Sequence, residues 1–337
     1  MRIGIAGAGL LGRLLAWRLA RAGHEVTVCD PASGPQRADG SAAGFTAAGM
    51  LSPLAELECG DASVAALGWR SLALWPRWLD ELQQPVHFAR RGSILLSHAG
   101  DRASAQRLMA RIAAQAPAHC PRPLAGDALR TLEPGIAQGV LGWLLEGEGQ
   151  IHPVEAMQAL AMAGQDHGVR WQWSRPVQQV SPGRLDHETF DQVIDVRGVG
   201  ARPQLPVRGV RGEIFWLHAP GVTLSHPLRL LHPRHRVYLV PRPGDLVVVG
   251  ASEIESEDRS PVSLRSTLEL LSAAYSVLPE LAEARIVHSE SNLRPALPDN
   301  LPHRHTEPGL TRLNGLFRHG WLVAPAIVED TVAEIAT

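Results

Sequence analysis

The chain has 337 residues, and its 32 basic residues are all Arg, with no Lys; against 34 acidic residues this gives a net charge of −2. The absence of lysine excludes an internal Schiff base, a P-loop of the GxxxxGK[ST] type and an SxxK nucleophile, because each needs a side-chain amine. The near-neutral charge argues against nucleic acid as the main partner, since phosphate binding normally requires a basic excess.

The composition, 45% hydrophobic and 20% charged, is that of an ordinary soluble protein, and the length of 337 residues suggests two domains. Cys29, Cys59 and Cys120 are far apart and form no CxxC motif, which favours a reducing compartment over a disulfide framework or a zinc cluster. No apolar run approaches the roughly 20 residues that a membrane span needs. We therefore expect a cytoplasmic protein without a membrane span.

The first thirty residues predict a strand, a glycine-rich turn, a helix and a second strand. Residues 3–6 are a short apolar run, residues 7–12 read GAGLLG and match GxGxxG, and an apolar stripe of helical spacing continues to Ala22. Residues 25–29 form the second strand, and Asp30 stands at its end. This is the context that a dinucleotide-binding fingerprint requires.

Each fingerprint residue has a physical role in that interpretation. Gly7 allows the tight turn, Gly9 lets a pyrophosphate approach the backbone, and Gly12 lets helix and strand pack closely. The helix N-terminus offers N–H groups to the pyrophosphate, and Asp30 can accept hydrogen bonds from the adenosine ribose. The alternative is a secretory signal peptide, because residues 20–22 read ARA after an apolar stretch, although three arginines interrupt that stretch.

The next elements follow from hydrophobic periodicity and turn residues. Helices are expected at about 60–85, at 101–115 and at 154–164, with turns at 133–135 and 146–149. Strands are expected at 92–96, 169–173 and 192–196, and antiparallel strands at 213–217, 237–240 and 246–249. No internal repeat or low-complexity linker separates these elements, so the two domains are expected to be interleaved.

A run of small residues at 40–53 follows the acid by about ten residues and is either a tight helix-packing surface or backbone lying along a long cofactor. Five segments stand in the order that is seen in the FAD-dependent amino-acid oxidases. They are GAGLLG at 7–12, AAGML at 47–51, VYLVPR at 237–242, LRP at 293–295 and FRHGWLVAP at 317–325. From residue 1 to about 330 the chain resembles the D-amino-acid oxidase superfamily, and within it the glycine oxidases of thiamine biosynthesis.

The resemblance implies an α/β fold, with a Rossmann-like FAD-binding domain interleaved with an α+β substrate domain on a mainly antiparallel sheet. The expected FAD-binding domain comprises residues 1–80, 148–212 and 290–337, and the substrate domain comprises 81–147 and 213–289. FAD is expected to be bound non-covalently, since no cysteine lies near Arg294. The residues expected to contact it are Gly7, Gly9, Leu10, Leu11, Gly12, Asp30, Pro31, Ala43, Gly44, Ala48, Gly49, Met50, Val177, Leu316, Phe317, Arg318, His319, Gly320, Trp321 and Leu322.

Three residues are expected to contact the substrate. Arg294 matches the position of a carboxylate anchor, a role that suits the planar fork of arginine; the alternative is a structural arginine. Tyr238 matches the family position of a second contact to the substrate carboxylate. The alternative interpretation is that Tyr238 is a sheet residue whose hydroxyl is in water. Arg318 matches a third family position, whereas His319 departs from the Asn that glycine oxidases commonly have there.

The resemblance implies oxidation of a small amino acid, glycine first, by hydride transfer to flavin N5, so that no side chain acts as an acid or base. Dioxygen is the expected acceptor, and a homo-oligomer is possible. The alternatives are a D-amino-acid dehydrogenase with a quinone or protein acceptor, a flavoprotein maturation factor that acts on a partner protein, and an NAD-binding dehydrogenase. No metal is expected, because the pairs His303–His305 and His232–His235 have no convincing third ligand.

Overall fold

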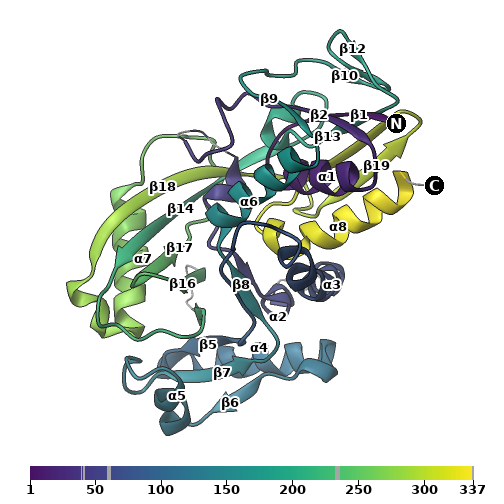
Figure 1. Cartoon of the computed structure of the whole chain (residues 1–337). Coiled ribbons are helices and arrows are strands. Elements are labelled where there is room, and N and C mark those ends of the chain that lie inside the picture. The colour runs from purple at the N-terminus through teal and green to yellow at the C-terminus, as the bar shows by residue number, and fades with distance from the viewer. Residues whose placement is uncertain (39, 41, 59–61, 232–235, 336–337) are drawn as a thin grey trace.

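The computed structural model describes residues 1–38, 40, 42–58, 62–231 and 236–335. Its elements form two regions, each built on one large sheet (Figure 1). The first region contains the N-terminal strand and the last helix, and the second contains the long strands β14 and β18. The chain passes between the regions several times, as an interleaved arrangement requires.

The first region is built on a six-stranded sheet with the order β19-β20-β13-β1-β2-β9. Neighbouring strands are parallel except for the pair β19 and β20, which is antiparallel. The strands are β1 (Arg2–Ala6), β2 (Glu25–Cys29), β9 (Arg170–Gln172), β13 (Gln192–Asp195), β19 (His303–Glu307) and β20 (Leu310–Asn314). The strand β1 lies between β2 and β13, with Ile3 and Ile5 fully buried, so residues 2–6 are a central strand of this sheet.

Four helices belong to this region: α1 (Leu10–Arg21), α3 (Ala62–Leu79), α6 (Pro153–Asp166) and α8 (Gly320–Ile335). The helix α1 packs against both α6 and α8, and α3 packs on α8. Trp75 of α3 stacks on Trp321 with ring centroids 5.6 Å apart, and its Nε1 donates to the Trp321 carbonyl at 3.0 Å. These contacts fix the first turn of α8, which is where the fingerprint region and the C-terminal motif meet.

The second region is built on an eight-stranded sheet with the order β18-β14-β17-β16-β15-β5-β7-β6. All neighbouring pairs are antiparallel except β15 and β5. The strands are β5 (Ser93–Ser97), β6 (Arg122–Leu124), β7 (Leu141–Leu145), β14 (Arg208–His218), β15 (Leu228–Leu231), β16 (Arg236–Arg242), β17 (Leu246–Gly250) and β18 (Arg285–Ala296). Helices α4 (Arg102–Gln115), α5 (Gly126–Leu132) and α7 (Leu264–Val277) accompany it (Figure 1).

Short elements complete the structure. One three-stranded sheet consists of β3 (Met50–Leu51), β8 (Gly149–Ile151) and β4 (Phe88–Ala89), and another of β10 (Val180–Ser181), β11 (Arg184–Leu185) and β12 (Glu188–Thr189). The helix α2 (Pro53–Glu56) precedes α3. The helix expected at 60–85 is shorter than predicted, because α3 ends at Leu79 and Asp80 and Glu81 form a turn. The remaining predicted helices and strands are present with ends shifted by a few residues.

The predicted fold class is therefore confirmed: a Rossmann-like region lies beside an α+β region on a mainly antiparallel sheet. The exact division into domains stays a prediction. The strands β14 and β18 run through the expected boundaries at residues 212 and 290, and they pair with each other along their length. Any boundary there therefore cuts two continuous strands.

Candidate active site

A cavity of about 1140 Å³ lies between the two regions. Its walls come from the β1–α1 turn, the small residues at 42–50, the turn at 196–200, the sheet strands β14, β15 and β16, and the C-terminal segment 292–322. Ligand pockets typically measure about 300–1,000 Å³. This cavity therefore has room for a dinucleotide and for a small second ligand beside it.

The first end of the cavity is the β1–α1 turn. Gly7 has φ of +105°, and a β-carbon there would lie 2.8 Å from the Val196 carbonyl oxygen, so the turn requires glycine. A β-carbon at Gly12 would lie 1.9 Å from the Gly7 carbonyl oxygen, so Gly12 lets α1 approach the turn. Among the described residues, no side chain caps the N-terminus of α1, and its first turn has no acidic residue. Its N–H groups are therefore available to an anion such as a pyrophosphate.

Asp30 lies at the carboxyl end of β2 and lines the same end of the cavity. Its Oδ2 accepts from the Ala8 N–H at 2.5 Å and its Oδ1 accepts from the Ala32 N–H at 2.8 Å. The carboxylate therefore ties the fingerprint turn to the segment after β2. Because a carboxylate has about four acceptor positions, it can also accept hydrogen bonds from ribose hydroxyls.

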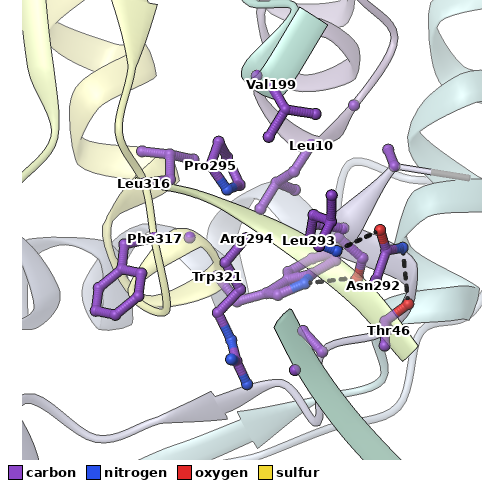
Figure 2. A pocket seen from close by; sticks show the side chains of 18 of the residues that line it. Leu10, Thr46, Val199, Asn292, Leu293, Arg294, Pro295, Leu316, Phe317 and Trp321 are labelled. Atoms are coloured by element: carbon purple, nitrogen blue, oxygen red, sulfur yellow. Dashed lines mark hydrogen bonds between the residues drawn. The ribbon is translucent and has the colours of Figure 1, made fainter. Parts of the chain in front are cut away.

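The small-residue segment forms the middle of the cavity wall. Gly49 has φ of +67°, and a β-carbon there would lie 2.1 Å from the Ile151 carbonyl oxygen. The buried guanidinium of Arg242 donates to the Ala48 carbonyl and, at 2.9 Å, to the Ile151 carbonyl. From the other side, Trp321 Nε1 donates to the Gly44 carbonyl at 3.0 Å (Figure 2). The segment is thus held at both ends and leaves its bare backbone facing the cavity.

The second end of the cavity lies on the large sheet, where Tyr238 and Arg294 line it. A β-carbon at Gly212 would lie 2.4 Å from Arg294 Cζ, and one at Gly250 would lie 2.7 Å from the Tyr238 hydroxyl. The two glycines therefore make room for the two polar side chains. Arg294 Nη1 donates to the Ser252 carbonyl at 3.0 Å.

The charges around Arg294 leave its guanidinium open to an anion. In the part of the chain that the structure describes, Arg294 forms no ion pair with a carboxylate, and its Nη1 donates to backbone carbonyls. Burial raises the pKa of the Tyr238 hydroxyl, although Arg294 and Arg242 oppose the shift through their positive charges and Arg294 also through a hydrogen bond. The hydroxyl therefore stays protonated beside a cation, which suits a second contact to a bound carboxylate.

Arg318 and His319 share a carboxylate partner at the edge of the cavity. Arg318 Nη2 and His319 Nδ1 each lie 3.0 Å from Glu56 Oε2. Burial alone would raise the pKa of Glu56, but the hydrogen bond from His319 and the charges of His319, Arg318 and Arg229 outweigh it and lower the pKa to about 2. Glu56 is therefore ionised throughout the neutral range, which makes it unsuited to act as a general base.

The structure brings almost all the predicted site residues together. Of the residues expected to contact FAD or the substrate, only Gly12 and His319 do not line the cavity. Gly12 packs behind the turn, and His319 is buried with its ring edge-on to Phe317. Val177 lines the cavity outside any strand, and its carbonyl accepts from Arg197 at 3.0 Å. Whether each residue contacts FAD or substrate stays a prediction.

Sequence reasoning missed the acidic residues that pair with the cavity arginines. Glu56 and Glu58 follow directly on the small-residue run, and Arg229 stands in an apolar strand, Leu228–Leu231. A signal for Arg229 was present, because a lone cation in an apolar strand is costly to bury without a partner. Its partners are more than 170 residues away in the chain, so the pairing itself required the fold.

The described residues contain no group of three or more side chains that could hold a metal ion. Of the histidine pairs considered above, His303 lies on the surface and contacts Asp299 at 2.6 Å, and His232 and His235 lie outside the described residues. None of the described helices is both long enough and apolar enough to cross a membrane.

Comparison with known proteins agrees with this geometry. A model of the FAD dependent oxidoreductase family matches residues 2–333. The putative thiamine biosynthesis oxidoreductase ThiO of Rhizobium etli is 38% identical over 340 residues, which cover 100% of this chain and 97% of that protein. The glycine oxidase of Geobacillus kaustophilus is 26% identical over 350 residues, covering 96% of this chain and 89% of that protein.

Solved structures show the same fold. The crystal structure of the Geobacillus kaustophilus glycine oxidase superposes with a TM-score of 0.87 at 25% identity, covering 99% of this chain and 95% of that one. An iminodiacetate oxidase from a Chelativorans species superposes with a TM-score of 0.84 at 24% identity, covering 99% and 95%, and shows the fold alone. The chain therefore belongs to the FAD dependent oxidoreductase family and is an FAD-dependent oxidoreductase of the ThiO and glycine oxidase type.

Proposed function

We propose that this protein oxidises a small amino acid, glycine first, to its imino acid, which then serves the synthesis of the thiamine thiazole. The observation that carries the proposal is the Arg294 guanidinium, which has no carboxylate partner among the described residues and lines the cavity beside Tyr238. A cation so placed is built to receive the carboxylate of a substrate. The names of the thiamine biosynthesis oxidoreductase and the glycine oxidase support the choice of substrate.

The residues at the first end of the cavity fit FAD. Gly7 and Gly9 leave the backbone open beside the N-terminus of α1, where a pyrophosphate would lie. Asp30 would accept from the ribose, and the segment 43–50 would lie along the rest of the cofactor. Among the residues that the structure describes, no thiol lines the sheet end of the cavity, which supports non-covalent binding.

When bound, FAD would supply the redox chemistry, a two-electron oxidation of the amino acid at its α-carbon with dioxygen as the acceptor and hydrogen peroxide as the by-product. The chain's own contribution is to hold the substrate in place. Arg294 would bind the substrate carboxylate with both its terminal nitrogens, and the Tyr238 hydroxyl would donate a further hydrogen bond. Together they would fix the orientation of the α-carbon, since two contacts to one carboxylate restrict its rotation.

The C-terminal segment would set the electrostatics at the far side of the cofactor. The helix α8 begins at Gly320, has no acidic residue in its first turn, and starts at the cavity wall. The N-terminus of a helix carries a partial positive charge. Close approach of this helix end would therefore favour negative charge on the neighbouring edge of the flavin.

The proposal can be tested with the FAD-loaded protein and a panel of glycine, sarcosine, D-alanine and D-proline. We expect oxygen consumption and stoichiometric hydrogen peroxide, with the highest kcat/KM for glycine. Oxidation of the panel without oxygen consumption would point instead to a dehydrogenase with a quinone or protein acceptor. No oxidation of any free amino acid, together with capture of a specific protein, would point to a maturation factor.

A further inference from the structure

A second arginine, Arg229, lies in the same cavity as Arg294. It stands on β15 directly across from Tyr238 on β16, and its side chain lines the cavity while the residue is only 9% exposed. Its Nη1 donates to the Ala55 carbonyl at 3.3 Å, which brings it to the end of α2. The cavity therefore holds a buried cation that the reaction proposed above does not use.

Two carboxylates neutralise this cation. Glu58 forms an ion pair with Arg229, and Glu56 acts on Arg229 through its charge. Burial lowers the pKa of Arg229 to about 10, and the negative charge of Glu56 opposes that shift. Glu56 also contacts Arg318 and His319, and Arg318 lies 3.8 Å from Glu253, so Arg229 belongs to a network of charged side chains in which Glu56 and Glu58 act on it directly.

The carboxylate partners of Arg229 distinguish it from Arg294. Arg294 has only carbonyl and hydroxyl partners among the described residues, so a bound carboxylate adds a missing counter-charge there. At Arg229 an incoming carboxylate would have to displace Glu58, or stand as a third negative charge beside two others. Like charges this close in a partly buried site repel strongly.

We propose that Arg229 is a second anion subsite that Glu56 and Glu58 keep closed, and that these carboxylates restrict the enzyme to amines with a single carboxylate. This inference rests on the proposed function, because it assumes that amino acids bind at Arg294. Dicarboxylate amines such as iminodiacetate and D-aspartate would then be poor substrates, even though the cavity contains a cation able to bind their second carboxylate. Removing one acid should open that subsite.

The test uses the FAD-loaded protein and unreactive carboxylates, whose binding is followed through the visible spectrum of the flavin. The probes are the monoanion acetate and the dianions malonate and succinate, which differ in length. The variants are Glu58→Gln, Glu56→Gln, and the double variant Glu58→Gln/Arg229→Gln, which removes both charges of the pair together. The control is Glu81→Gln, which removes a carboxylate from a surface ion pair with Arg18 and Arg21 outside the cavity.

For Glu58→Gln we expect the dissociation constant of at least one dianion, relative to that of acetate, to fall by about tenfold or more, because a charged hydrogen bond to Arg229 is gained. Glu56→Gln should lower the same ratio of dissociation constants, dianion to acetate. The double variant should lose the gain in dianion affinity, and Glu81→Gln should match the wild type. The kcat/KM for iminodiacetate relative to glycine should follow the same pattern. A loss of packing alone would weaken the binding of all the carboxylate probes equally.

The inference is overturned if both single variants keep the wild-type ratio, or if the double variant retains the gain. These outcomes are separable from failure of the proposed function. A wild-type protein that oxidises glycine while Glu58→Gln gains no dianion affinity rejects the subsite alone. A wild-type protein that does not oxidise glycine, with a gain in Glu58→Gln, rejects glycine as the substrate and supports the subsite.

Discussion

Replacing Gly212 with alanine tests the placement of Arg294 without touching Arg294 itself. The new β-carbon would lie 2.4 Å from Cζ and Nη2 and 2.5 Å from Nη1 of Arg294. The guanidinium must move by about 1 Å to regain an ordinary contact, and a misplacement of that size can lower a rate by about 10²-fold. If the carboxylate contact is lost altogether, the cost is about 3 kcal/mol, which again corresponds to about 10²-fold.

The assay is kcat/KM for glycine together with the dissociation constant of acetate, with thermal unfolding as a check on folding. We expect kcat/KM to fall and the dissociation constant of acetate to rise, each by about 10²-fold. Tm should change little, because the group that moves is the end of a flexible side chain. Gly100→Ala is the matched control, since nothing lies within 4 Å of the added carbon. Wild-type affinity for acetate in Gly212→Ala would refute the position assigned to the anchor.

Three further perturbations follow from the structure. Arg294→Ala should raise KM and lower kcat/KM for glycine by roughly 10²-fold or more, which steady-state kinetics would show, and unchanged kinetics would remove Arg294 from the site. Gly49→Ala should destabilise the fold and weaken FAD retention, because φ is +67° and the new carbon would lie 2.1 Å from a carbonyl oxygen; a wild-type Tm and flavin content would contradict this. Burial raises the pKa of Glu148 to about 7 from the ordinary 4.5, against hydrogen bonds from Ser93, Ser52 and the backbone, so between these values the folded state holds a proton that the unfolded state releases. Stability from this group is therefore lost as pH rises through 7. Relative to the wild type, the free energy of unfolding of Glu148→Gln should increase by on the order of 3 kcal/mol between about pH 5 and pH 8, as urea unfolding would show. A difference between the two proteins that does not change with pH would refute the shift.

The nucleotide end of the cavity could be predicted from the sequence because its determinants are local. Gly7, Gly12 and Asp30 lie within one strand–turn–helix–strand unit, and the closest contact of Gly12 and the hydrogen bond of the Asp30 carboxylate with Ala8 are inside that unit. Gly7 is required by the positive φ of the turn itself, although its close neighbour Val196 comes from a later segment. The alternation and the period of the apolar residues also located most strands and helices. The helix expected at 60–85 was wrong in length because α3 ends at Leu79, and the apolar residue Leu82 continues the periodicity into the turn that follows.

The substrate end depended on contacts that periodicity does not encode. Tyr238 and Arg294 were placed through resemblance to a family, and the glycines beneath them, Gly212 and Gly250, passed unnoticed because their role depends on neighbouring strands. The pairing of Arg229 with Glu58 joins β15 to the turn after α2, which only the tertiary fold brings together. The ion pairing in the cavity therefore had to come from the structure.

The measurement that bears most on the proposed function is anaerobic mixing of the FAD-loaded protein with glycine in a stopped-flow spectrometer. We predict that the visible absorbance band of oxidised FAD disappears, at a rate that saturates with glycine concentration, and returns when dioxygen is admitted with formation of hydrogen peroxide. An oxidised band that persists at saturating glycine, in protein that retains its FAD, would contradict glycine oxidation at this site.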